Sequence, residues 1–529
     1  MRCCNSVICC MKYVVSLIIA LALWCVGASA QKSEQQRQIE KLTFVYQQIR
    51  NAYVDDVPLG PLVEEAIRAT IKELDPHSAY LTKKELEAMR SRMKGQFAGV
   101  GMTFMSYRDT VVVRGVNSDS PAERSGLRLN DRIVSVDGRG VVGIDSDSIM
   151  SLLRGDEGTE LTLGIRRRGE AKELTINITR DVIQRSAIDA AFRIGDIGYI
   201  SATSFSRPLA VDFMREYYGL GDVKALIVDL RDNGGGIIGS AVDLTSIFLK
   251  KGDLIVSTDG RIDHEVCYRN NKPHSIDIPL VVLINESSAS ASEIFAGAIQ
   301  DHDRGVIVGR TSFGKGLVQR TFELGDGSGI NLTIARYKTP SGRLIQRPYT
   351  MGESEAYRRD TMRFMHPDSL EHDPELMFTT LKRGRKVYGG GGITPDIYVA
   401  GEDAEYSDEF ATLFYEDRIK SFFVELWDWT SVEEMAKCYP TLDTILAEFE
   451  VDARMEAIFK SATEYSYSDF NDKEREYLKV LIMAEIARQL YGENACYYVL
   501  QRDDDAMLTR AVELLESPEE YERVLSGDM

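Results

Sequence analysis

The chain of 529 residues is poor in the residues that form metal sites and disulfide frameworks. It contains only six histidines and eight cysteines, and five of these cysteines lie within the first 25 residues. The histidines form no H-x-x-x-H pair, and the other cysteines, Cys267, Cys438 and Cys496, are far apart in the sequence. The pattern contains neither a disulfide framework nor a metal-ligand spacing. We therefore expect no metal ion and no other cofactor.

Positive charge is also scarce. The chain has 63 Lys and Arg residues against 82 Asp and Glu residues, which gives a formal net charge of −19 at pH 7. A surface with this charge repels the phosphate backbone of DNA and RNA. The composition therefore argues against nucleic acid as a partner.

Long apolar runs are confined to the N-terminus. Residues 1–30 combine a basic start, an apolar run over 13–26 and the A-x-A sequence Ala28-Ser29-Ala30, which together are typical of a secretory signal peptide. The apolar run is shorter than the roughly 20 residues that cross a bilayer. We expect cleavage before Gln31 and export to the periplasm or cell envelope. An uncleaved membrane anchor is the alternative.

Hydrophobic periodicity divides the rest of the chain into four parts. Residues 31–95 have apolar side chains at helical spacing, whereas 96–181 consist of short β-branched runs broken by glycine. Strands and helices alternate over 182–400, and 401–529 are acidic and helical. We therefore predict a multidomain α+β protein with an N-terminal helical segment, a small β domain, an α/β core and a C-terminal helical module. The C-terminal module is a candidate surface for homo-oligomer formation.

Individual elements can be predicted in the two central parts. For the small domain we expect one helix over 146–153 and strands near 101–105, 110–114, 132–136, 160–166 and 172–178. For the core we expect buried strands over 225–230 and 279–284 and an alanine-rich helix over 290–300.

Ser290 lies where the second of these core strands gives way to the alanine-rich helix. The free N–H groups at a helix start can stabilise an oxyanion, so a serine at this point is a candidate nucleophile. The alternative is structural, because Ser290 and Glu293 also form the S-x-x-E pattern of a capping box. This segment alone leaves both interpretations open, with the cap favoured.

Two glycine-rich segments shift that balance. Lys315 stands between Gly314 and Gly316, which is a poor setting for a helix, although an exposed turn would also explain it. Gly234, Gly235 and Gly236 directly follow a buried strand, where free backbone N–H groups can approach a ligand. A tight turn between strand and helix is the alternative for the triglycine.

Together these segments resemble the signature blocks of the carboxyl-terminal processing, or tail-specific, serine peptidases. The 25 residues from Ser290 to Lys315 match the spacing in that family, and the matching blocks run in the family's order from about residue 35 to 400. In the family a proline often occupies the position of Gly234. The blocks are Asp229-Leu230-Arg231 with its glycines, Ser288 to Glu293, Phe313 to Gly316 with Gln319, Leu74 to Ser78, Phe97 to Gly101, Ser120 to Ala122, Tyr337 to Gly342 and Gly392 to Asp396.

The resemblance implies a serine-type endopeptidase with a Ser/Lys dyad, in which Ser290 is the nucleophile and Lys315 is the general base. It also implies that Gln319 orients the lysine, and that Glu293 and Asp301 are supporting acids. The oxyanion donors would be the Ala291 N–H and a glycine of the triglycine turn, with Gly235 and Gly236 preferred but Gly234 not excluded.

Chemistry limits where the acids can lie. Lysine is a base only when neutral, although its free pKa is about 10.4, so burial must favour the neutral amine. A glutamine can aim the amine without restoring its charge, whereas a carboxylate against Nζ would stabilise the ammonium. We therefore expect Glu293 and Asp301 to lie away from the lysine amine. In an extended chain, residues 315 and 319 lie about 13 Å apart, so a bulge or leaning side chains must bring them together.

The start of the small domain resembles the carboxylate-binding loop of PDZ domains. In that mode, backbone N–H groups hold a chain terminus while the peptide adds as a strand beside a helix. We therefore expect protein or peptide substrates with free apolar C-terminal residues. The residues expected to bind the peptide are Gly99, Val100, Gly101, Met102, Phe104, Ile149 and Leu153.

Three alternatives compete with this interpretation. Ser312 and Lys315 form an S-x-x-K pattern, which is typical of penicillin-binding acyl transferases, but that chemistry needs a helix there. Gly234, Gly236 and Gly239 match the dinucleotide fingerprint, with Asp259 twenty residues further on. The third alternative is a PDZ peptide-binding scaffold without catalytic activity.

Overall fold

The computed structural model describes residues 33–273, 276–359, 374–401, 406–501 and 505–528. The chain forms two compact units, residues 1–71 and 72–529. The predicted signal peptide lies outside the described residues. Within the described ranges, every helix is too short or too polar to cross a membrane.

The first unit is helical, as predicted. It contains α2 (Glu34–Ala52) and most of α3 (Leu59–Lys72), and the Ser33 side chain caps α2 by accepting the Gln36 N–H. Every residue of α2 is at least partly exposed, including Ile39 and Phe44.

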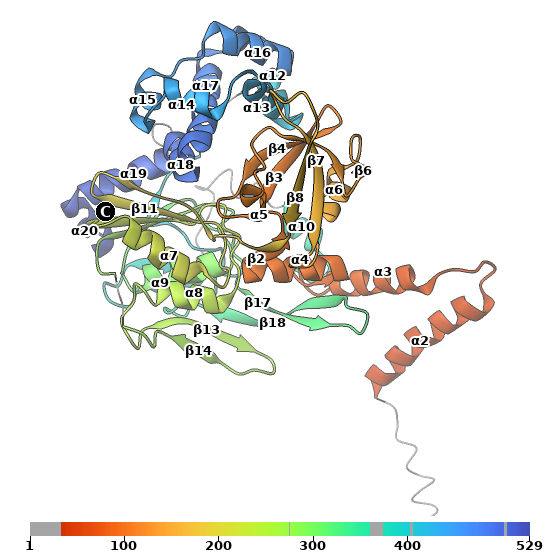
Figure 1. Ribbon diagram of the computed structural model, residues 1–529. Coiled ribbons are helices and arrows are strands. Elements are labelled where there is room, and N and C mark those ends of the chain that lie inside the picture. The colour runs from red at the N-terminus through yellow and green to blue at the C-terminus, as the bar shows by residue number, and fades with distance from the viewer. Residues whose placement is uncertain (1–32, 274–275, 360–373, 402–405, 502–504, 529) are drawn as a thin grey trace, which may run out of the picture. The chain divides into compact units, whose positions relative to one another are not determined.

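The second unit begins with a strand and a helix that approach the later core. Strand β1 (Ala79–Leu81) pairs with β18 (Gly329–Lys338). Helix α4 (Lys83–Lys94) starts with a capping box between Thr82 and Glu85 and ends at Gly95, which adopts φ +68°. Strand β2 (Gln96–Gly99) then pairs with β9 (Asp181–Gln184), so the two strands form a stalk at the entry and exit of the small domain (Figure 1).

The small domain is a twisted antiparallel sheet with one long helix. Its strand order is β3-β4-β5-β7-β8, with β6 paired to β5, so β3 is an edge strand among the described residues. The predictions for β5, β7 and α6 are confirmed, whereas β3 and β4 each run two residues beyond the predicted end. The bounds are β3 (Met102–Tyr107), β4 (Thr110–Val116), α5 (Pro121–Arg124), β5 (Arg132–Val136), β6 (Arg139–Gly140), α6 (Ser146–Leu153), β7 (Glu160–Arg166) and β8 (Leu174–Thr179).

The core of the molecule is a sheet of order β10-β11-β12-β15-β16-β21, parallel except for the first pair. Its strands are buried on both faces, as continuous apolar runs predict. On β12, Leu226 and Val228 face α7, α8 and α9, whereas Ala225 and Ile227 face the helices at the C-terminal end of the chain. The bounds are β10 (Ile188–Ile194), β11 (Ile197–Ala202), α7 (Leu209–Gly219), β12 (Ala225–Asp229), α8 (Ile238–Thr245), β15 (Leu280–Ile284), α9 (Ala291–Asp301), β16 (Val306–Gly309) and β21 (Ile397–Tyr398).

A second antiparallel sheet lies below this core in Figure 1. Its order is β1-β18-β13-β14, and β17 pairs with β18 with a register shift between Val318 and Gln319. The bounds are β13 (Leu254–Gly260), β14 (Val266–Arg269) and β17 (Leu317–Glu323), and α10 (Ser354–Arg359), the 3-10 turn Pro374–Leu376 and the hairpin of β19 (Met377–Thr379) and β20 (Lys386–Tyr388) follow β18.

The C-terminal module is helical, as predicted, and has a core of its own built around Phe422, Phe459 and Leu478. Its last two helices, α19 and α20, instead pack on the core sheet. The bounds are α12 (Asp408–Tyr415), α13 (Arg418–Trp429), α14 (Val432–Cys438), α15 (Leu442–Glu448), α16 (Ala453–Thr463), the 3-10 turn Tyr467–Asp469, α17 (Asp472–Tyr491), α18 (Glu493–Gln501), α19 (Ala506–Glu516) and α20 (Pro518–Ser526).

The helical module contacts the small domain through polar pairs. Arg114 of β4 meets Glu485 of α17 at 2.8 Å, and Arg132 of β5 meets Asp428 of α13 at 2.5 Å. Leu129 of the small domain packs against the apolar core of the module. These contacts join segments about 300 residues or more apart in the sequence.

Candidate active site

Ser290 occupies the sharp corner between β15 and α9. Its backbone adopts φ +57° and ψ −111°, a conformation that residues with a Cβ rarely adopt and that costs about 1–3 kcal/mol. The capping box with Glu293 is present, and Glu293 Oε2 accepts the Ser290 N–H at 2.8 Å. A cap alone does not require a positive φ, because capping residues ordinarily adopt extended backbone. The strained corner is therefore an observation in favour of a functional serine.

Glu293 connects the serine corner to the lysine segment. The residue is 0% exposed, and its two carboxylate oxygens accept four hydrogen bonds. Oε2 accepts the N–H groups of Ser290 at 2.8 Å and Lys315 at 2.9 Å. Oε1 accepts the Gly314 N–H at 2.7 Å and the Ser312 hydroxyl at 2.6 Å. Burial raises the pKa of Glu293, and these four hydrogen bonds oppose that rise.

Lys315 is partly buried and lies in a segment that is neither helix nor strand. Burial lowers the pKa of the Lys315 amine, and the charges of Glu293 and Asp75 oppose that change. The Nζ atom donates to Gln319 Oε1 at 3.1 Å, and among the described residues it forms no ion pair. The carboxylate of Glu293 meets the backbone of the lysine rather than its amine, as the chemistry requires.

Lys315 and Gln319 meet through their side chains. The register shift between Val318 and Gln319 leaves the extra residue, Ile334, on β18 rather than on β17, so it does not shorten the chain from Lys315 to Gln319. The two side chains instead lean together, to within hydrogen-bond distance. The amide nitrogen of Gln319 in turn donates to the His77 carbonyl. That carbonyl is fixed because Asp75 accepts the His77 and Ser78 N–H groups at 2.8 Å. The amide oxygen of Gln319 is thereby the atom that faces the amine.

Tyr337 adds a second bridge between the two predicted catalytic residues. Its hydroxyl lies 3.0 Å from the Ser290 carbonyl oxygen and 2.5 Å from that of Lys315. The side chain is 1% exposed, and burial raises its pKa well above the ordinary tyrosine value, so the phenol stays neutral. In the described part of the chain, however, no hydrogen bond joins Ser290 Oγ to Lys315 Nζ.

The triglycine turn lies directly against the serine corner. A Cβ on Gly235 would come within 2.5 Å of the Ala289 carbonyl and 2.8 Å of the Ser290 Cβ, so the close approach requires glycine. The Gly235 N–H already donates to Asn233 Oδ1 at 2.9 Å. The N–H groups of Gly236 and Ala291 have no hydrogen-bond acceptor among the described residues. These two N–H groups are therefore free to donate to an oxyanion, whereas that of Gly235 is already used.

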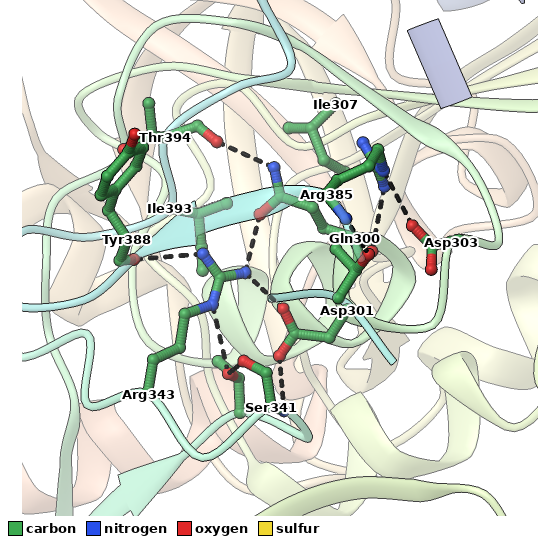
Figure 2. A network of polar contacts seen from close by, with 12 residues as sticks. Gln300, Asp301, Asp303, Ile307, Ser341, Arg343, Arg385, Tyr388, Ile393 and Thr394 are labelled. Atoms are coloured by element: carbon green, nitrogen blue, oxygen red, sulfur yellow. Dashed lines mark hydrogen bonds and ion pairs between the residues drawn. The ribbon is translucent and has the colours of Figure 1, made fainter. Parts of the chain in front are cut away.

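Asp301 lies at the opposite end of α9 from Ser290. Figure 2 shows it in a buried network, where Asp301 Oδ1 pairs with Arg343 at 2.7 Å and Oδ2 accepts the Ser341 N–H at 2.9 Å. Arg343 also donates to Gln300, and Arg385 pairs with Asp303 at 2.8 Å in the same region. Asp301 thus anchors the loop after β18 to the end of α9 and does not reach the lysine.

The predicted peptide-binding loop lies between β2 and β3. Gly101 adopts φ +79° and packs against Ser120, and the N–H groups of Val100 and Gly101 have no acceptor among the described residues. A carboxylate could therefore bind there. Met102 and Phe104 are partly buried, whereas Ile149 and Leu153 of α6 are 0% and 4% exposed and belong to the core of the small domain.

The structure disfavours the two rival motifs. Ser312 is 1% exposed, donates to Glu293 and accepts the Ile393 N–H at 2.7 Å, and its segment is not helical. The glycine fingerprint lacks its structural context, because Asp259 lies on β13 of the second, antiparallel sheet and not on a strand beside β12 in the parallel sheet. Within the described ranges, no group of His, Cys, Asp and Glu side chains could hold a metal ion.

Sequence reasoning missed three residues of this site. Tyr337 belongs to one of the matching blocks, but nothing in the block predicts that its hydroxyl bridges two carbonyls. Asn233 is 0% exposed, and besides the Gly235 contact its carbonyl accepts the Ala289 N–H at 3.0 Å. His77 acts through its backbone, which no side-chain pattern reveals.

Family models match three segments of the chain. Residues 196–351 match the family model of peptidase family S41, residues 98–178 that of the PDZ domain, and residues 24–85 that of the activating protease CtpB N-terminal domain. None of these three matches extends beyond residue 351.

Individual relatives give the same result. A carboxy-terminal-processing protease of Bartonella bacilliformis is 35% identical over 346 residues, which are 63% of this chain and 79% of that protein. A probable CtpA-like serine protease of Staphylococcus haemolyticus is 33% identical over 322 residues, which are 60% of this chain and 64% of that protein. Among solved structures, the photosystem II D1 C-terminal processing protease is 26% identical, with a TM-score of 0.34, and the match covers 67% of this chain and 86% of that chain.

Proposed function

Because the chain belongs to the carboxy-terminal processing family of serine-type peptidases, we propose that it is exported and cleaves proteins near their C-termini with a Ser290/Lys315 dyad. The observation that carries this proposal is the Glu293 bridge, which ties the strained serine corner to a lysine whose pKa is lowered by burial. The leader-like residues 1–30 support export.

In the proposed mechanism, neutral Lys315 removes the proton from the Ser290 hydroxyl as Oγ attacks the scissile carbonyl carbon. Gln319 Oε1 accepts a hydrogen bond from Lys315 Nζ, with 3.1 Å between the two atoms, and so limits the rotation of the amine. The nitrogen lone pair is thereby left free for the proton. Because Gln319 is uncharged, it orients the base without stabilising its protonated form.

The tetrahedral intermediate carries a negative oxygen beside the start of α9. The N–H groups of Ala291 and Gly236 are the proposed donors to this oxygen, and the positive end of the helix dipole adds to their effect. The Lys315 ammonium then gives its proton to the departing amine, which leaves an acyl group on Ser290. Water, deprotonated by the regenerated neutral lysine, releases the acyl group and restores the serine.

Substrate binding has to complete the dyad, because no hydrogen bond joins Oγ to Nζ in this structure. Catalytic hydrogen bonds are often long in free enzymes and shorten in the complex with substrate. A rotation of the Ser290 side chain on its fixed backbone is the smallest change that would bring Oγ to the amine.

The PDZ-like domain is proposed to capture the free C-terminus of the substrate. The free N–H groups of Val100 and Gly101 and the edge position of β3 support this role. The stalk of β2 and β9 connects this domain directly to the peptidase core.

Cleavage of an unstructured peptide with apolar C-terminal residues tests both halves of the proposal. Purified chain from Gln31 onward should cleave it, Ser290→Ala and Lys315→Ala should each abolish cleavage, and Ser312→Ala should retain it if the protein folds. The amidated peptide should have a lower kcat/KM than the free acid. Activity that survives Ser290→Ala would overturn the dyad, and equal kcat/KM for both peptides would overturn end capture.

A further inference from the structure

A cleft of about 730 Å³ lies between the PDZ-like domain and the C-terminal module. One wall comes from the turn between β3 and β4, from β5 and from the turn after β7. The other wall comes from α13 and α16. We call this space the inter-module cleft, and its charged residues are Arg108, Arg132, Arg168, Arg454, Glu425 and Asp428.

The two acids of the cleft already have cationic partners. Asp428 takes two hydrogen bonds from Arg132, at 2.8 and 2.5 Å, and a third from Asn130. Glu425 accepts from Arg108 at 2.8 Å and from the Tyr107 hydroxyl at 2.6 Å. Neither carboxylate is therefore available to neutralise the other two arginines.

Arg168 and Arg454 are the two other cations of the cleft, and both lie at Trp429. Arg168 donates to the Trp429 carbonyl at 2.6 Å, and its distance to the carboxylate of Glu434 is 3.8 Å. The Arg454 guanidinium lies 5.8 Å from the Trp429 ring centre and forms no ion pair among the described residues. Both side chains are exposed, in a protein whose net charge is −19. The cleft is thus a local site of positive charge on an acidic protein.

A second cavity adjoins the cleft at the far end of β3. It has a volume of about 580 Å³ and is lined by Met105 and Ser106 of that strand and by Ser146 at the start of α6. Tyr107 and Arg108 line both this cavity and the inter-module cleft. The end of β3 therefore lies beside the cleft that holds Arg168 and Arg454.

The direction of a bound peptide follows from the fold. A terminus held at Val100 and Gly101 makes the peptide run antiparallel along β3, so its upstream residues leave the strand at Tyr107. At about 3.3 Å per residue, a peptide paired along the six residues of β3 reaches the cleft about six to nine positions before its terminus.

We propose that the inter-module cleft is a second substrate subsite, which binds carboxylate side chains about six to nine residues upstream of the captured C-terminus. Arg168 and Arg454 are its specificity-determining residues, and Trp429 offers an apolar surface between them. The proposal rests on end capture by the PDZ-like domain. It assigns to the C-terminal module a part in choosing the substrate.

Binding to the Ser290→Ala protein tests the subsite without cleavage. The probes are fluorescent 14-residue peptides with the same apolar end and either two Glu or two Gln residues at the seventh and eighth positions before the terminus. We expect about three- to tenfold tighter binding of the Glu peptide at low salt, and a smaller difference in 0.5 M salt. A third peptide, with the Glu pair at the second and third positions, should lose the advantage.

Arginine variants locate the effect. Arg168→Gln and Arg454→Gln, together in the same background, should make the Glu and Gln peptides bind equally. Arg139→Gln removes an exposed arginine of β6 outside the cleft and should leave the preference unchanged. Equal binding of the two peptides by the starting protein, or a preference that persists in the double variant, would overturn the proposal.

Two further results separate this inference from related ideas. If amidation of the peptide leaves binding unchanged but the Glu preference disappears in the double variant, the PDZ-like domain does not capture the C-terminus. The cleft then still binds carboxylate side chains, but at positions that are not counted from the terminus. If the double variant instead loses binding to phosphatidylserine vesicles and keeps its peptide preference, the cleft is a membrane-binding surface and the subsite is wrong.

Discussion

The surroundings of Ser290 and the contact between the PDZ-like domain and the C-terminal module are held together in different ways. Around Ser290, buried Glu293 binds three backbone N–H groups and one hydroxyl, and the Tyr337 hydroxyl lies against two backbone carbonyls. Between the modules, side chains supply the contacts, to other side chains or, as from Arg168 to Trp429, to a backbone carbonyl. Arg132 and Asp428 are 28% and 35% exposed. The backbone fixes the first region, whereas side chains that can exchange partners hold the second.

The difference matters for function. Positions set by backbone hydrogen bonds change only when the fold changes, which suits a serine and a lysine that must meet within a fraction of an ångström. Partly exposed ion pairs such as Arg132–Asp428 are each worth about 1 kcal/mol or less, so this part of the inter-module contact can adjust to different substrates.

Among the variants that test this difference between the two regions, Glu293→Gln should have the largest effect, a fall in kcat. The amide places an NH2 group opposite N–H donors that now face a carboxylate oxygen, so either the serine corner or the lysine segment must shift. Because a displacement of about 1 Å can cost 100-fold in rate, we expect kcat to fall by about two orders of magnitude. Thermal unfolding should confirm that the variant folds. Glu286→Gln, whose carboxylate pairs with Arg310 near the surface of the same loop, should retain most activity. A folded Glu293→Gln protein with the wild-type rate would contradict the claim that Glu293 holds Ser290 and Lys315 in their catalytic positions.

A smaller effect is expected at the inter-module contact. Arg114 and Glu485 are 16% and 6% exposed, so Arg114→Met leaves a buried carboxylate with fewer partners. We expect a loss of about 2 kcal/mol in urea unfolding, below the full cost of breaking a buried pair, because Glu485 keeps its contact with Arg488. The double variant Arg114→Met, Glu485→Met should lose less than the sum of the single variants.

The exposed pair of Arg124 and Asp181 is the matched control for that measurement, with side chains 57% and 48% exposed. Arg124→Met should change stability by about 1 kcal/mol or less. Equal losses for Arg114→Met and Arg124→Met would show that the inter-module pair contributes no more than a surface contact.

The sequence predicted the regular elements and the residue types of the site. The helix over 146–153 and the strands over 132–136 and 160–166 appear with the predicted bounds, because alternating or helical apolar spacing within one element determines them. Ser290, Lys315 and Gln319 could be singled out because their segments together resemble the signature blocks of one peptidase family, although the segment of Ser290 alone favours a helix cap.

The remaining features depend on contacts between distant segments. The positive φ of Ser290, the contact between the Lys315 and Gln319 side chains and the use of the Gly235 N–H by Asn233 are set by packing, which no local pattern encodes. The resemblance implied Asp301 as a supporting acid, but its partner Arg343 comes from a loop about 40 residues later, and their pairing places it away from the dyad. The inter-module cleft is lined by residues from two distant segments, 107–168 and 425–461.

The central claim is that Lys315 acts as a neutral base because burial lowers its pKa. The direct test is the pH dependence of kcat/KM for one peptide in the wild type and in Gln319→Glu. Raising the pH converts the ammonium to the amine, so activity should rise through a pKa below the ordinary lysine value of 10.5. The new carboxylate in Gln319→Glu should stabilise the ammonium, which raises that pKa and moves the rising limb to higher pH. A flat wild-type profile, or a rising limb at the same pH in both proteins, would contradict the account.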